Sequence, residues 1–112
     1  TGEPAPSTAL LVAAVRRDYF LTVQGGITSG VVMKTEDLPT FGNAIAGIHY
    51  LPRVIAKARA KLRGELDPDI MFCCGGDRKF FRQHGGIHPA DFLRQVWLAG
   101  DQDLKIVDFV RR

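Results

Sequence analysis

The stretch Leu51-Pro-Arg-Val-Ile-Ala-Lys-Ala-Arg-Ala-Lys-Leu-Arg63 decides the fold of this chain. Pro52 suits the first turn of a helix, where its missing N–H costs nothing, and Gly64 suits the position just past the end. At about 100° per residue, the apolar side chains fall on one stripe of this helix: Leu51, Val54, Ile55, Ala58 and Leu62. We therefore expect a core-facing amphipathic helix from Pro52 to Leu62.

The polar side chains of this helix are all basic: Arg53, Lys57, Arg59, Lys61 and Arg63. The pattern predicts an exposed surface that is wholly cationic. Such a surface can neutralise a carboxylate or a phosphate, and planar guanidinium groups can bind these anions through two hydrogen bonds. The alternative is a solvated helix face, with apolar stems on neighbouring side chains and charged ends in water.

The rest of the C-terminal part also has helical signals. Asp77 is expected to cap a short helix over residues 78–84, which Gly85 ends. His88-Pro89 opens the next helix, and Gly100 ends it. Asp101 is then expected to cap a last helix that carries apolar side chains.

The N-terminal part is predicted to hold one helix and a β-hairpin. Residues 1–7 form a loose polar lead-in, and Ser7 or Thr8 can cap a helix that runs to about Arg17. The β-prone runs 19–23 and 27–33 flank Gly25-Gly26, which favours a hairpin between them. The predicted fold is mainly α: a compact bundle of four to five helices, with an N-terminal hairpin, in a single domain over residues 8–112.

The composition places the chain among ordinary globular domains. Its 112 residues are 46% hydrophobic and 24% charged, which excludes disordered and low-complexity classes. The formal net charge of +3 is too small to indicate a dedicated nucleic-acid-binding protein, and no aromatic ladder accompanies the basic helix. The charge is local, however, because residues 1–50 contain three bases and four acids, whereas residues 51–112 contain twelve and eight.

Other patterns favour a cytoplasmic protein. The longest apolar run, residues 9–15, is too short to span a membrane, which needs about 20 residues, and it lacks the flanks of a secretory signal. The only cysteines, Cys73 and Cys74, are adjacent, which disfavours a disulfide and fits a reducing compartment. No phosphate-binding or dinucleotide-binding pattern accompanies Gly25-Gly26 or Ser29-Gly30, so we expect no cofactor.

A second candidate site surrounds Cys74-Gly-Gly-Asp77. A thiol at a helix N-terminus is activated by the backbone N–H groups, and His84 is the nearest candidate base. The alternative is an inert, buried cysteine. Cys73, Cys74, His84 and His88 do not suit a zinc site, because zinc-binding cysteine pairs are separated by two to four residues. We expect no metal, and we expect capping roles for both histidines.

The residues from about Leu38 onward resemble a family of small bacterial proteins known only as a domain of unknown function. The resemblance rests on Gly47-Ile-His-Tyr-Leu-Pro-Arg53, Ile55 and Lys57-Ala-Arg59, and on a second, weaker block that includes Cys74 and Asp77. In that family Pro-Leu usually stands between the cysteine and the aspartate, where this chain has Gly75-Gly76. The resemblance implies a mainly helical fold and no activity, and it does not extend to residues 1–34.

Two functions remain open from the sequence. The first is a small non-catalytic module that binds an anionic small molecule or protein partner through Arg53, Lys57, Arg59 and Lys61. The alternative is a thiol-dependent enzyme or redox protein that uses Cys74, with Cys73 less favoured, assisted by His84 or His88. The sequence favours the first, disfavours nucleic acid and a membrane as partners, and leaves the ligand open. The aromatic load of the short C-terminal helices also suggests a homo-oligomer.

Overall fold

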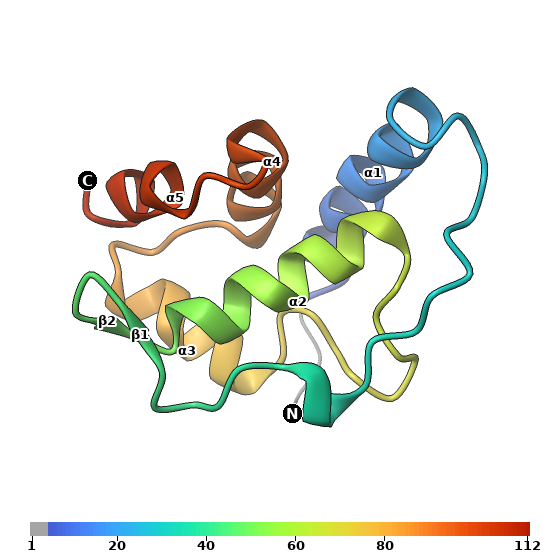
Figure 1. Cartoon of the computed structure of the whole chain (residues 1–112). Coiled ribbons are helices and arrows are strands. Elements are labelled where there is room, and N and C mark those ends of the chain that lie inside the picture. Colours follow the sequence, from blue (N-terminus) through green and yellow to red (C-terminus); the bar gives the residue numbers. More distant parts are fainter. Residues whose placement is uncertain (1–4) are drawn as a thin grey trace.

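A computed structural model describes residues 5–112 of the chain (Figure 1). The elements follow in the order α1 (Pro6–Thr22), η1 (Thr35–Asp37), β1 (Ala44–Ile45), β2 (Ile48–His49), α2 (Leu51–Arg63), α3 (Gly75–Gln83), α4 (Pro89–Ala99) and α5 (Asp103–Val110). The prediction of a mainly α fold with a small hairpin is confirmed. No helix in this part of the chain is long and apolar enough to span a membrane.

Helix α2 is the central element, and it extends one residue beyond the predicted range at each end. Gly64 follows it with a left-handed φ of +69°, and its N–H bonds back to the last turn. The apolar stripe from Leu51 to Leu62 is buried as expected. Ala60, on the opposite side of the helix, is also fully buried. The helix is therefore enclosed on more sides than its single apolar stripe predicts, with α1 and α4 both packed against it.

The structure corrects the position of the hairpin. Tyr19–Thr22 continue α1, and residues 27–32 form no strand. The helical spacing of Val12, Val15 and Tyr19 explains this, because the first two are buried in the core and the ring of Tyr19 packs edge-on against Trp97. Tertiary packing on one helix face thus outweighs the β preference of this run.

The observed hairpin joins β1 to β2, with Ala44 opposite His49 and Ile45 opposite Ile48. Its two-residue turn, Ala46-Gly47, has φ values of 52° and 80°. Positive φ at both central positions matches the right-handed twist of a hairpin, and glycine adopts it at little cost. This short ribbon leads directly into α2, so it fixes the segment that precedes that helix.

The ends of the remaining helices agree in part with the prediction. Helix α4 begins at Pro89, with His88 as its cap and Gly100 after its last residue, as predicted. Helix α3 begins at Gly75 instead of Arg78, and α5 begins at Asp103, two residues after the expected cap. Helix α1 begins at Pro6, inside the predicted lead-in, whose residues 1–4 lie outside the described part. The rings of Phe80, Phe81 and Phe92 are buried in the chain's own core.

Candidate functional site

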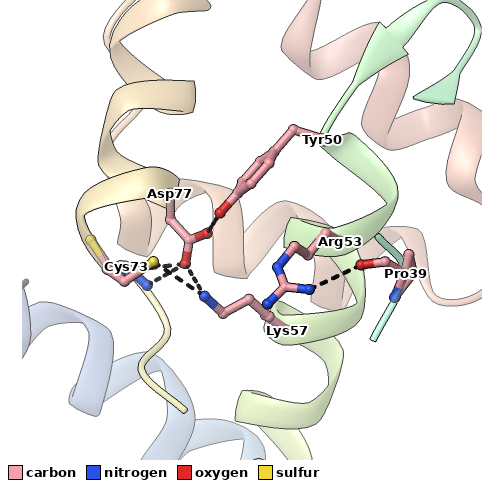
Figure 2. A network of polar contacts seen from close by, with 7 residues as sticks. Pro39, Tyr50, Arg53, Lys57, Cys73 and Asp77 are labelled. Atoms are coloured by element: carbon pink, nitrogen blue, oxygen red, sulfur yellow. Dashed lines mark hydrogen bonds and ion pairs between the residues drawn. The ribbon is translucent and has the colours of Figure 1, made fainter. Parts of the chain in front are cut away.

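A buried carboxylate connects the first turn of α3 to α2. Asp77 is fully buried and accepts hydrogen bonds from Lys57 Nζ at 2.8 Å, from the Tyr50 hydroxyl at 2.6 Å and from the Cys73 N–H at 2.9 Å. Figure 2 shows these groups converging on its two oxygen atoms. We expected Asp77 to be the N-cap of this helix, but the N-cap is Cys74, and Asp77 is the third residue of α3. Its side chain accepts from the Cys73 and Cys74 N–H groups that precede the helix.

Lys57 corrects the prediction of an exposed cationic helix face. Only 2% of this residue is exposed, and its ammonium group forms a buried ion pair with Asp77. Burying one charge alone would be very unfavourable, so the two groups are retained as a pair. Burial of the phenol raises the pKa of Tyr50 well above its ordinary range, and the hydrogen bond that its hydroxyl donates to the charged carboxylate of Asp77 raises it further.

Two further basic residues of α2 already have partners within the chain. Arg53 donates to the Pro39 carbonyl at 3.1 Å, and its guanidinium lies 4.4 Å from the centre of the Phe41 ring. Arg59 pairs with Asp103 at 2.6 Å, which joins α2 to α5.

Lys61 differs from these arginines because the charge that acts on it is that of another base, Arg16. Its pKa is lowered by partial burial and by the charge of Arg16. With Lys57 in the interior, Arg53, Lys57, Arg59 and Lys61 do not form one continuous exposed surface.

The two adjacent cysteines have opposite environments. Cys73 is 1% exposed, has a left-handed φ of +69°, and burial followed by the nearby charge of Asp77 raises its pKa to about 11. Cys74 is partly exposed at the N-terminal cap of α3, and its Sγ accepts from Lys57 Nζ at 3.4 Å. The thiol of Cys74 is therefore beside an ammonium group and a helix N-terminus, whereas that of Cys73 is held neutral in the core.

Cys74 lines a cavity with a volume of about 780 Å³. The cavity lies between the hairpin and α3, and its aromatic walls are Phe41, Tyr50, Phe80 and His84. The structure thus brings Cys74 and His84 to one cavity, as the thiol hypothesis requires. It does not bring His88 there, because that ring accepts a hydrogen bond from the Ala90 N–H and caps α4.

Sequence reasoning missed Tyr50 and Phe41 as members of this site. The spacing gave no signal for them, because Phe41 reaches the cavity from the segment before the hairpin and Tyr50 from the N-cap of α2. Metal-ligating side chains do not cluster in groups of three or more anywhere within residues 5–112.

Comparisons with known proteins give a family and no activity. The model of a family described as a domain of unknown function, DUF5069, matches residues 41–112. This range includes the hairpin, both cysteines and all the residues that line the cavity. No curated protein and no solved structure matches the chain.

Proposed function

This chain belongs to the DUF5069 family, and from its cavity we propose that it is a thiol-dependent protein in which Cys74 reacts with a small molecule. One observation carries the proposal: Cys74 Sγ lies 3.4 Å from the buried ammonium of Lys57 and lines a cavity of about 780 Å³. A positive group and a helix N-terminus both stabilise a thiolate, which is the nucleophilic form of cysteine.

The proposed step is nucleophilic attack. The Cys74 thiol loses its proton to solvent or to the His84 ring, and the thiolate donates an electron pair to an electrophilic carbon of the bound molecule. A sulfur–carbon bond forms while the bond to the leaving group breaks, and the leaving group departs with that electron pair. Redox chemistry between Cys73 and Cys74 has less support, because neighbouring cysteines rarely reach disulfide geometry and Cys73 is buried.

Binding of an anionic partner on the basic helix stays a prediction with less support. Lys57 is buried, and the guanidinium groups of Arg53 and Arg59 already have partners. Two cysteines that form no disulfide fit a reducing compartment, so a cytoplasmic location belongs to this proposal, and a bacterial source follows the family resemblance. Homo-oligomerisation remains a prediction that light scattering tests; exposed Leu10, Leu21 and Ile27 on and after α1 support it.

Alkylation by iodoacetamide at neutral pH tests the thiol proposal. We compare Cys73→Ala, which keeps only Cys74, with Cys74→Ala, which keeps only Cys73. Folded Cys73→Ala should react at least about tenfold faster than the same variant unfolded in urea, because only folding places the thiol beside the Lys57 ammonium and the N-terminus of α3. Folded Cys74→Ala should react far more slowly.

A double variant that lacks both buried charges tests the role of Lys57. Replacing Lys57 by Met together with Asp77 by Asn removes both buried charges, and we expect alkylation of Cys74 to slow toward the rate of the unfolded chain. Circular dichroism checks that this variant is folded. If folded Cys73→Ala reacts no faster than the unfolded chain, Cys74 is an ordinary thiol and the proposal is wrong.

A further inference from the structure

The cavity beside Cys74 has walls made of connected aromatic rings. Phe41 stacks on Tyr50 with 6.0 Å between ring centres and 6° between planes, and Tyr50 in turn contacts Phe80 at 5.7 Å. The ring of His84 continues the series, with 4.4 Å between its centre and that of Phe80. These rings come from three separate parts of the chain. A cavity with such walls favours a planar aromatic molecule, which can stack or pack edge-on against them.

Phe41 is the most exposed of these four rings. It is 66% exposed, although its neighbour Tyr50 is partly buried and Phe80 is buried in the core. The guanidinium of Arg53 covers this ring within 4.4 Å, which holds it over the cavity without burying it. An exposed ring fixed at the edge of an aromatic cavity provides a surface on which a bound molecule can lie.

The charges around this cavity favour an anion. Its lining includes Lys79, His49 and His84 and no carboxylate. Lys79 is exposed on α3 and, among the described residues, has no hydrogen-bond or ion-pair partner. Asp77 does not line the cavity; it is fully buried and paired with Lys57. The ammonium of Lys79 is therefore available to pair with an anionic group of a bound molecule.

The first turn of α3 adds to this preference. The cavity is lined there by Gly76, whose missing side chain lets the Tyr50 hydroxyl approach to within 3.0 Å of where a Cβ would stand. The dipole of α3 also favours negative charge at its N-terminal end. The charge of Lys79 and the dipole of α3 therefore both favour an anionic ligand.

From these observations we infer that the cavity binds a planar aromatic molecule that carries an anionic group, a carboxylate or a phosphate, with the ring against Phe41 and Tyr50 and the anion near Lys79. This inference rests on the proposed function in that the same molecule would present its electrophilic carbon to Cys74. It differs from the expectation of an anionic partner on α2, because the basic residue involved is Lys79 and the surface is concave.

Binding is tested in a Cys74→Ser variant, so that the result does not depend on the thiol chemistry. The probes are 2-naphthoate, 2-naphthyl phosphate and the neutral 2-naphthamide, titrated while amide chemical shifts are followed by NMR. We expect at least one anion to bind about tenfold more tightly than the amide, as one charge-assisted hydrogen bond would give. The shifts should concentrate at the residues that line the cavity. The anion that binds more tightly distinguishes a carboxylate ligand from a phosphate ligand.

Three substitutions, each added to Cys74→Ser, separate the contribution of the Lys79 charge to probe binding from that of the Phe41 ring. Lys79→Gln should abolish the preference for the anion and leave the affinity for the amide unchanged. Phe41→Ala should weaken all three probes, because it removes an exposed ring without opening the core. Lys105→Gln is the control, since it removes an exposed lysine of α5 that does not line the cavity.

The two proposals fail in different ways. If the amide binds as tightly as both anions, or if the shifts lie elsewhere, the inferred ligand class is wrong, whatever the alkylation rate of Cys74. If the anions bind as expected while folded Cys74 alkylates no faster than in the unfolded chain, the ligand class stands and the thiol function is wrong.

Discussion

The buried pair between Lys57 and Asp77 leads to the sharpest prediction on stability. Lys57→Met keeps the length and the apolar stem of the side chain but removes its ammonium group. Asp77 would then remain fully buried, with only the Tyr50 hydroxyl and backbone N–H groups as donors. A carboxylate that loses its counter-charge in the interior destabilises the folded state, because nothing replaces the lost attraction or hydration.

The expected loss is large for a domain of this size. Removing one partner of a buried ion pair costs about 3–5 kcal/mol. The total free energy of unfolding of such a domain is about 5–15 kcal/mol, so this loss is a substantial part of it. With a shift of roughly 4 °C in Tm per kcal/mol, Lys57→Met should unfold about 12–20 °C lower than the parent chain. Thermal and urea unfolding followed by circular dichroism measure both quantities.

Two variants make this prediction specific. Asp77→Asn added to Lys57→Met removes both charges, and the amide oxygen still accepts one hydrogen bond, so about half of the lost stability or more should return. Arg63→Met is the matched control on the same helix. Its ion pair with Glu65 is 3.9 Å long, and 41% of the Arg63 side chain is exposed, so it should cost under about 1 kcal/mol. A loss below about 1 kcal/mol in Lys57→Met, or no recovery in the double variant, would refute the reasoning.

Three further predictions follow from single groups. Burial raises the pKa of Cys73 to about 11, whereas an unfolded thiol has a pKa near about 8.5. The folded Cys74→Ala variant should therefore remain unlabelled by iodoacetamide at pH values where the unfolded variant is labelled. Rapid labelling of the folded variant would contradict this prediction. Gly64→Ala should lower the free energy of unfolding, measured in urea, by about 1–2 kcal/mol, because φ is +69° and an added Cβ would meet the guanidinium of Arg16. An unchanged urea midpoint would contradict the left-handed conformation of Gly64. The lowered pKa of Lys61 means that its charge disfavours folding until it is lost, so the contribution of Lys61 to the free energy of unfolding should rise as the pH rises toward 10.5. Cys73 and Tyr50, whose pKa values are raised, contribute with the opposite sign, so Lys61 is isolated by comparing the parent chain with a variant of Lys61 alone. Lys61→Met should therefore raise Tm at neutral pH, and that advantage should shrink toward pH 10.5; an equal advantage at every pH would contradict it.

Local signals in the sequence accounted for the helices whose ends are marked by proline and glycine. Pro52 and Gly64 bound α2, and Pro89 and Gly100 bound α4, because these residues act through their own backbone preferences. The same local reasoning misassigned residues 19–23 as a strand. Their β preference is weak beside the packing of Val15 in the core and of Tyr19 on Trp97.

The candidate site was partly accessible from the sequence. Cys74 and His84 were identified as neighbours of a helix and do line one cavity. The pattern of bases on α2 was read as a surface, and for Lys57 this was wrong, because periodicity places a residue on a face without saying what covers that face. The N-terminal end of α3 packs there and supplies the carboxylate of Asp77.

By itself, the sequence determined the helical class of the protein, the bounds of its central helix and the residues of its apolar stripe, since each depends on contacts within a few positions along the chain. Only the tertiary structure decided which charges are buried, which cysteine faces a cavity and which rings surround it. Those properties depend on groups that are distant in sequence: Tyr50, Lys57 and Asp77 meet only when the hairpin, α2 and α3 pack together.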